Sequence, residues 1–223
     1  MVRMNEVELT ENEHNYAYTI TVNHENQRLD NLEQTDPESI RRLLVSALDR
    51  FAKVGYHAAT TREISLGAGM SPAALYVHFE SKEVILFRLS RLGHESVLRV
   101  MEESAGTNSG PGDWVASVVH ALTIWHCFHI ALGRVAQYEL EALTDEHRAV
   151  ISEHRRAIQR LMERGVQQGV DCGDFDAASV RDVSRAILAL TVDVVRWYQP
   201  DRGLAPETLA ENYAELALRM LHS

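Results

Sequence analysis

Hydroxyl, imidazole and ammonium groups recur within the short stretch MSPAALYVHFESKE, residues 70–83. Tyr76 and His78 fall late on a predicted helix, and Lys82 falls in the first turn of the helix that follows. A phenol and an imidazole can donate hydrogen bonds to phosphate oxygens, and the free N–H groups of a helix's first turn also attract phosphate. The types and spacing of these residues therefore favour a surface that binds a phosphate backbone.

Each of these residues also has a purely structural interpretation. Leu75, Phe79 and Ile64 are predicted to pack in a small core, and Tyr76 could join them. A histidine such as His78, taken alone, is more often a surface residue. Its place between Tyr76 and Lys82 favours the phosphate-binding role for all three.

The elements that must position this stretch are helices with clear start and stop signals. Asp36 and Pro37 predict an N-cap and a first-turn proline, and the apolar stripe that follows stops at Gly55. Thr60 opens a second, short helix with the Thr-x-x-Glu pattern of a capping box. Ser71 and Pro72 then begin a third helix behind a glycine turn, and Ser81 begins a fourth. Two short helices on either side of a glycine turn predict a helix-turn-helix.

Residues 36–90 resemble the DNA-binding domain of the TetR (tetracycline repressor) family. The resemblance is carried by FAKVGYHAATTREIS (51–65), GAGMSPAALYVHF (67–79) and ESKEVIL (80–86). It implies that Thr60, Thr61 and Arg62 face DNA from the second helix. It also implies that Ser71, Ala73 and Ala74 approach the bases and that Tyr76, His78 and Lys82 hold the phosphate backbone. Ala73 and Ala74 offer only methyl contacts, which suit thymine methyl groups, so direct base reading would rest mainly on Arg62 with DNA shape adding to it.

Net charge restricts where nucleic acid could bind. The chain has 22 basic and 32 acidic residues, a formal charge of −10, which duplex DNA repels. Residues 36–95 carry 8 basic and 7 acidic side chains and are the block best able to approach phosphate. Residues 1–35 carry 2 basic and 7 acidic side chains, so we expect them to be held away from DNA.

Downstream of residue 36 every periodic segment is helical, and we predict an all-α fold. The run SAGTNSGPGD at 104–113 predicts a linker. The predicted divisions are an acidic N-terminal extension (1–35), a three-helix helix-turn-helix domain with a connecting fourth helix (36–104), and a larger helical domain for ligand binding and dimerisation (105–223). Within the last of these, helices are predicted over about 113–129, 131–142, 145–168, 176–198 and 206–221. The segment YAYTITV (16–22) alternates like a strand, but no second strand is predicted. It could pair with its copy in another subunit or pack on helices, and of the three alternatives we favour a flexible segment.

Apolar residues recur at helical spacing along 180–197 and 209–220 and predict buried seams. Such seams can belong to the subunit's own core. The family resemblance implies that the last two helices pair across a two-fold axis, giving a homodimer that binds a palindromic double-stranded DNA operator. Its two reading heads would lie about 34–36 Å apart.

Bulky and polar-tipped side chains in the C-terminal half could line a small-molecule cavity or simply form core. The candidates for ligand binding are Trp114, Leu122, Trp125, Phe128, His129, Tyr138, Met162 and Trp197. Residues 128–148 and 196–221 resemble family members that respond to acyl-CoA or steroid-CoA thioesters. For such an effector, Arg134, Arg155 or Arg156 is expected near the opening.

Other chemistries are not supported by the sequence. His120, His126, Cys127 and His129 do not form a set at metal-ligand spacing, and adjacent positions on one helix point about 100° apart, which argues against a Cys–His catalytic pair. We therefore expect no catalytic residues, no metal and no cofactor. The sequence has no long apolar run and no secretory signal, which predicts a cytoplasmic protein without a membrane span. The function predicted is a ligand-responsive transcriptional repressor; the rival is a dimeric lipid- or thioester-binding protein or enzyme whose helix-turn-helix is not used for DNA.

Overall fold

The computed structural model describes residues 36–104 and 110–222, and this part of the chain is helical with no β-strand. The predicted strand at 16–22 and the acidic extension lie outside the described residues. The elements are α2 (Glu38–Ala58), α3 (Thr61–Gly67), α4 (Pro72–His78), α5 (Lys82–Ser104), α6 (Pro111–Phe128), α7 (Ile130–Tyr138), η2 (Leu140–Ala142), α8 (Asp145–Cys172), α9 (Val180–Val192), α10 (Val194–Trp197), η3 (Pro200–Arg202) and α11 (Pro206–Met220). The all-α prediction is confirmed.

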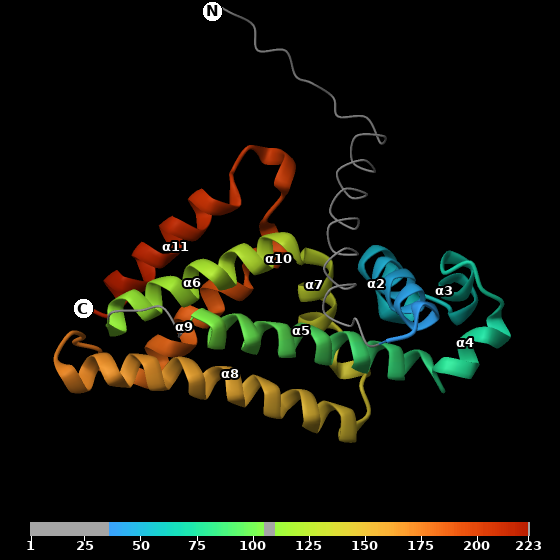
Figure 1. Cartoon of the computed structure of the whole chain (residues 1–223), viewed down its shortest axis with the longest axis horizontal. Helices are drawn as coiled ribbons and strands as arrows, with labels where there is room; N and C mark the ends of the chain where they lie inside the picture. The colour runs from blue at the N-terminus through green and yellow to red at the C-terminus, as the bar shows by residue number, and fades with distance from the viewer. Residues whose placement is uncertain (1–35, 105–109, 223) are drawn as a thin grey trace, which may run out of the picture.

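Helices α2, α3 and α4 gather at one end of the molecule (Figure 1). The capping box predicted for α3 is present, since the Thr60 side chain accepts from the Glu63 N–H while the Glu63 carboxylate accepts from the Thr60 N–H. Ser71 caps α4 by accepting from the Ala74 N–H at 3.2 Å. Between the two helices Gly69 has φ +68°, a backbone conformation that favours glycine. The helix-turn-helix thus forms through the local signals visible in the sequence.

The start of α2 differs from the prediction. Its N-cap position is Pro37, and no side chain caps the helix there. The Asp36 carboxylate instead pairs with the Arg88 guanidinium of α5, at 2.9 and 3.1 Å. A charged partner brought close by folding therefore takes the carboxylate that the sequence alone assigned to a cap.

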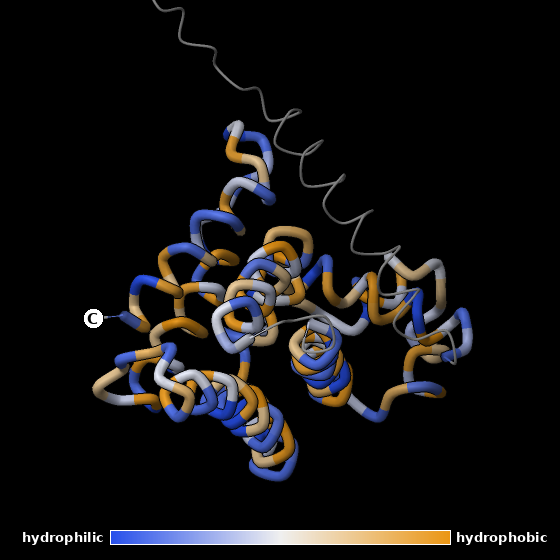
Figure 2. The backbone as a smooth tube through the Cα atoms, turned by 60° about the vertical axis from the view of Figure 1, so that its left-hand side comes forward, coloured by the Kyte–Doolittle hydropathy of each residue, from blue (hydrophilic) through white to orange (hydrophobic). Residues whose placement is uncertain are grey.

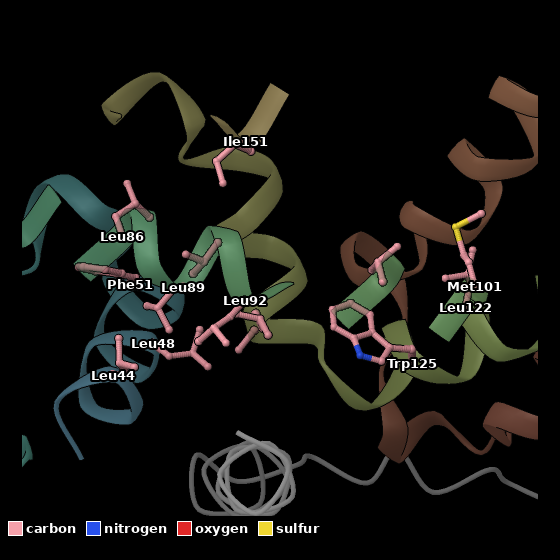
Figure 3. Close-up of a cluster of buried hydrophobic side chains, with 14 of the residues drawn as sticks. Leu44, Leu48, Phe51, Leu86, Leu89, Leu92, Met101, Leu122, Trp125 and Ile151 are labelled. Atoms are coloured by element: carbon pink, nitrogen blue, oxygen red, sulfur yellow. The ribbon is translucent and has the colours of Figure 1, made fainter. Parts of the chain in front are cut away.

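Helix α5 lies at the centre of the molecule, between α6 and α8, and reaches α2 at its first turns (Figure 1). Leu44, Leu48 and Phe51 of α2 pack with Leu86, Leu89 and Leu92 of α5, close to Ile151 of α8, and the same buried cluster continues to Met101, Leu122 and Trp125 (Figure 3). One continuous core therefore joins the helix-turn-helix to the C-terminal helices. The division of the chain near residue 105 stays a prediction.

The C-terminal helices are amphipathic, with apolar and polar segments alternating along the chain (Figure 2). Several of their ends differ from the predicted ones: α7 ends at Tyr138 rather than near 142, and α9 begins at Val180 rather than near 176. Helix α8 continues past Gly169 to Cys172 and ends at Gly173, whose φ is +82°. The single helix expected over 176–198 is divided into α9 and α10 at Asp193.

Within residues 36–104 and 110–222, no helix taken singly has both the length and the apolar character to cross a membrane. Helices α6 and α7 have the necessary length and apolar composition only when they are taken together, and the two helices are bent by 96° relative to each other.

Candidate nucleic-acid interface and ligand cavity

The outer surface of α3 and α4 presents the residues predicted to face DNA. Tyr76 is 55% exposed, and its hydroxyl lies 3.1 Å from the Thr61 hydroxyl. Thr60, the N-cap residue of α3, and Arg62, in the first turn of that helix, are also exposed. The bond between Thr61 and Tyr76 links the two helices and fixes the phenol at the surface of α4.

The remaining predicted residues of α4 differ in their accessibility. Ser71 and Ala73 are exposed, whereas Ala74 and His78 are half-buried. Val77 is 80% exposed, and we did not predict a role for it. Its position between Tyr76 and His78 gives the helix an exposed apolar group, and apolar side chains can contact the methyl group of thymine.

Lys82 does not turn outward as predicted. Its ammonium donates to the carbonyls of Tyr56 at 2.6 Å, Ala59 at 2.7 Å and His57 at 3.4 Å. It also lies 4.3 Å from the centre of the Tyr56 ring. An ammonium has three donors, and these carbonyls occupy them. In this structure Lys82 therefore closes the C-terminal end of α2.

A second surface feature is an ion pair between α2 and α3. The Arg50 guanidinium lies 2.7 Å from the Glu63 carboxylate. Hydrogen bonds from the Thr60 backbone and hydroxyl, aided by Arg50, hold the pKa of Glu63 below its ordinary value. The carboxylate thus stays ionised in the capping box, and the neighbouring guanidinium offsets its charge near the proposed DNA surface.

A cavity of about 440 Å³ lies among α5, α6, α7, α8 and α9. Three of the predicted ligand-binding residues line it, namely Leu122, Trp125 and Tyr138. The predicted arginine that lines it is Arg155, and Arg185 lies on the lining as well. The size falls within the range of small-molecule sites in proteins. Ligand binding by these residues remains a prediction.

The other five predicted residues do not line this cavity. Trp114 packs against Gly165 of α8, and Met162 is fully buried in the core. His129 stacks on Trp125, with ring centres 4.5 Å apart. Phe128 is half-buried and Trp197 is exposed, both away from the lining. The sequence therefore identified mostly interior positions, although Tyr138 and Trp197 are exposed, and it did not distinguish residues that line the cavity from residues that contact a neighbouring helix.

Two of the three predicted arginines are used elsewhere. The Arg134 guanidinium donates to the Val195 carbonyl at 2.6 Å. Arg156 pairs with Glu153 at 2.7 Å. Both therefore stabilise helix ends or surfaces, and neither lines the cavity.

Two buried histidines on the lining, His94 of α5 and His126 of α6, escaped the sequence analysis as ligand contacts. The sequence suggested His126 only as a metal ligand or as a catalytic partner of Cys127, and it suggested no role for His94. Burial lowers the pKa of each to about 4. Only the folded arrangement brings together two histidines that are 32 positions apart in the sequence.

The described residues support neither a metal site nor Cys127 as a nucleophile. They contain no group of three or more His, Cys, Asp or Glu side chains placed to hold a metal ion. Burial raises the pKa of the Cys127 thiol to about 12. A thiol so reluctant to ionise is a poor nucleophile.

Polar contacts connect the cavity helices to the helix-turn-helix. Glu139, just after α7, accepts from the Tyr56 backbone N–H at 3.0 Å. Tyr56 follows Gly55, where α2 is kinked with φ +79°. On the other side of α5, Glu83 accepts from the Thr144 N–H at 3.0 Å, beside the start of α8. Displacement of α7 or α8 would therefore act directly on α2 or α5.

Comparison with known proteins matches both halves of the chain. The family described as "Tetracyclin repressor-like, C-terminal domain" matches residues 109–221, and "Bacterial regulatory proteins, tetR family" matches residues 43–89. The HTH-type transcriptional repressor KstR2 of Mycolicibacterium smegmatis is 30% identical over 180 residues, which are 79% of this chain and 87% of that protein.

Solved structures agree. A bacterial regulatory protein in the tetR family from Rhodococcus RHA1 is 36% identical with a TM-score of 0.80, over 84% of this chain and 98% of that one. The ketosteroid transcriptional regulator KstR2 of Mycobacterium tuberculosis is 26% identical with a TM-score of 0.75, over 82% of this chain and 95% of that one.

Proposed function

The chain belongs to the tetracycline repressor family of transcriptional regulators, and from this premise we propose that it is a repressor that a small apolar effector releases from its operator. Regulators of this family bind DNA and small molecules as dimers and are generally not enzymes. The single observation that carries the proposal is that α5 joins an exposed helix-turn-helix to an internal cavity, because α5 packs on α2 in one core and also lines the cavity.

On the DNA side, α4 of each subunit enters the major groove of a palindromic operator. Tyr76 and His78 bind phosphate, Thr60, Thr61 and Arg62 approach from α3, and Val77 adds an apolar contact. In a dimer the two α4 helices reach successive major grooves when they lie about 34–36 Å apart. We assign Lys82 to the support of α2 rather than to phosphate, because its three donors are engaged by carbonyls.

On the effector side, an acyl-CoA or a related thioester is the class that we propose. Leu122, Trp125 and Ile158 supply apolar wall to the cavity, which suits an acyl or fused-ring portion. Arg155 and Arg185 are exposed at its edge, where guanidinium groups can pair with phosphates of a coenzyme A moiety. The M. tuberculosis relative KstR2 is a ketosteroid transcriptional regulator, which supports a bulky apolar effector.

The release mechanism that we propose runs through α7. This helix contributes Gly133 and Ala136 to the cavity, and Glu139 at its end holds the Tyr56 N–H of α2. A ligand that prefers a shifted α7 pulls on α2 at its Gly55 kink and changes the separation of the two reading heads. The ligand moves the equilibrium only by its differential affinity for the two arrangements.

An electrophoretic mobility shift experiment tests this proposal. The purified chain should retard DNA from upstream of its own gene in a salt-sensitive manner, and acyl-CoA or steroid-CoA thioesters should release it. A Tyr76→Ala, His78→Ala variant should remain dimeric and lose the retardation. Thioester binding without any salt-sensitive DNA binding would instead favour the lipid- or thioester-binding protein, and would refute the repressor.

A further inference from the structure

Two imidazoles from neighbouring helices lie on the wall of the cavity. His94 of α5 is 5% exposed and His126 of α6 is 3% exposed. A charge on His94 would lower the pKa of His126, so the two rings are within electrostatic reach of each other. They form a buried polar pair on an otherwise largely apolar wall, and we call them the histidine pair.

Hydrogen bonds fix the tautomer of both rings. Nδ1 of His94 lies 2.8 Å from the Ser90 carbonyl oxygen, and Nδ1 of His126 lies 2.7 Å from the Leu122 carbonyl oxygen. A carbonyl only accepts, so each Nδ1 must carry the hydrogen. Because burial keeps both rings neutral, each Nε2 is left with a lone pair and acts as an acceptor.

Three other polar side chains that line the cavity are already engaged within the protein. The Thr191 hydroxyl donates to the Leu188 carbonyl at 3.0 Å, and the Gln159 amide donates to Glu163 at 2.9 Å. Arg155 donates to the Gln137 side chain at 2.8 Å. Across the described part of the chain, the structure records no donor to Nε2 of either histidine. A donor carried by a bound molecule could therefore pair with either Nε2.

We propose that the cavity selects apolar molecules that carry a hydrogen-bond donor, a hydroxyl or an amide N–H, at the buried end, where His94 and His126 accept its hydrogen. This inference rests on the proposed function in taking the cavity as the effector site. It adds a chemical requirement, because a ligand carbonyl or ether in the same place would face two lone pairs and be disfavoured. The histidine pair thereby makes a hydroxylated effector bind more tightly than its oxidised or methylated counterpart.

Phenol and toluene are suitable probes, since they share a ring and differ in one donor. Calorimetry on the full chain gives the dissociation constants of phenol and toluene. Their ratio can be compared between variants, because the difference in hydrophobicity between the two probes is the same for each variant. We expect His94→Phe or His126→Phe to reduce the preference for phenol about five- to tenfold, the equivalent of one neutral hydrogen bond.

His129→Phe is the matched control. His129, between α6 and α7, is equally buried, and its Nδ1 also faces the carbonyl four residues back, at 2.7 Å, but it does not line the cavity. The ratio should therefore be unchanged in His129→Phe. A ratio unchanged in both cavity variants, or no binding of either probe by the wild-type chain, overturns the inference.

Nitrogen-15 NMR of the histidine-labelled wild-type chain tests the same idea without any substitution. Nε2 of both rings should be unprotonated in the free protein, and at least one should shift with phenol and not with toluene. A protonated Nε2 in the free protein contradicts the inference. Operator retardation on the same preparation separates the two claims: DNA binding without a phenol preference removes only the inference, and a phenol preference without DNA binding removes only the repressor.

Discussion

At the scale of single residues, side chains with similar sequence signals have different partners. Tyr76 is held at the surface by the Thr61 hydroxyl, 3.1 Å away, and so presents its phenol outward. Lys82, six positions later, is turned inward onto the carbonyls at the end of α2. The two residues should therefore fail in different ways when replaced.

Lys82→Met should lower stability, because the Tyr56 and Ala59 carbonyls lose a charged donor; we expect a loss of about 1–2 kcal/mol in the free energy of unfolding. Urea unfolding measures this loss. The dependence of operator affinity on salt should keep its wild-type slope, because no phosphate contact is removed. Arg62→Met, at an exposed position of α3, is the control that should weaken DNA binding at unchanged stability. A shallower salt slope for Lys82→Met would place its ammonium on phosphate.

The sequence predicted the contacts of some of these side chains and could not predict where the others point. Thr60, Glu63 and Ser71 were predictable because a cap depends on atoms three residues apart. Lys82 was not, because its acceptors lie more than 20 positions earlier. The same limit explains His94 and His126, because the cavity that they line exists only where α5, α6, α7, α8 and α9 meet.

At the scale of elements, glycines on α8 let other elements approach closely. A Cβ built at Gly165 would lie 1.8 Å from the Trp114 ring of α6, and one at Gly169 would lie 2.0 Å from the Phe175 ring. Gly169 was expected to end the helix, but here it provides space, and the helix ends at Gly173. A glycine in a helical pattern can thus mark close packing, and the sequence alone does not distinguish packing from a helix end.

Gly165→Ala should therefore destabilise the chain, since the methyl group must displace Trp114; overpacking of this kind costs about 1–3 kcal/mol. Thermal unfolding followed by circular dichroism measures the effect. Gly112→Ala in the first turn of α6 is the matched control, because nothing lies within 4 Å of a Cβ there. It should leave stability unchanged or raise it by up to about 1 kcal/mol. Equal stability of the two variants would contradict the close packing of α8 on Trp114.

The end of α7 is the element that we expect to couple the cavity to α2. Glu139→Ala removes the acceptor of the Tyr56 N–H, so an effector should still bind the cavity but release the operator less effectively. We expect the coupling between effector and DNA to fall about fivefold or more, which lies within typical coupling energies. Fluorescence anisotropy of labelled operator, titrated with effector, measures it.

Glu139→Gln keeps a side-chain oxygen that can accept from the Tyr56 N–H and is the control for that experiment. It should behave much like the wild-type chain. If effector releases Glu139→Ala from the operator as well as it releases the wild-type chain, the coupling does not run through Glu139. It would then run through Glu83 of α5, which accepts from the Thr144 N–H and from Nδ1 of His147 at 2.8 Å.

At the scale of the whole molecule, one core runs from α2 through α5 to α6 and α8. We therefore expect the helix-turn-helix and the cavity walls to unfold together with α5, as one unit. A buried group that titrates on α5 or α6 should then change the free energy of unfolding of the whole chain. The histidine pair supplies two such groups.

The sign of this pH dependence follows from the lowered pKa of both histidines, about 4 in the folded chain against an ordinary value of 6.5. Between these values the unfolded chain binds more protons than the folded one, so stability rises with pH. The stabilisation is complete above about pH 6.5 and is lost as pH falls toward 4. Carboxylates with lowered pKa, such as Glu153 and Asp193, add their own pH dependence only as pH falls below their ordinary values of 4.5 and 3.8, at the lower end of this window and beneath it.

Urea unfolding at pH 7 and pH 5 should accordingly show a loss on the order of 2 kcal/mol for each histidine of the pair. His126→Gln should lose correspondingly less between the same two pH values, because one buried titrating group is gone. His57→Gln should show the wild-type loss, since the His57 ring is exposed and stays in water on folding. Because the stabilising effect of neutral rings reaches the whole molecule through α5 and α6, a flat pH profile for the wild-type chain would mean that His94 and His126 are not buried together in the folded protein.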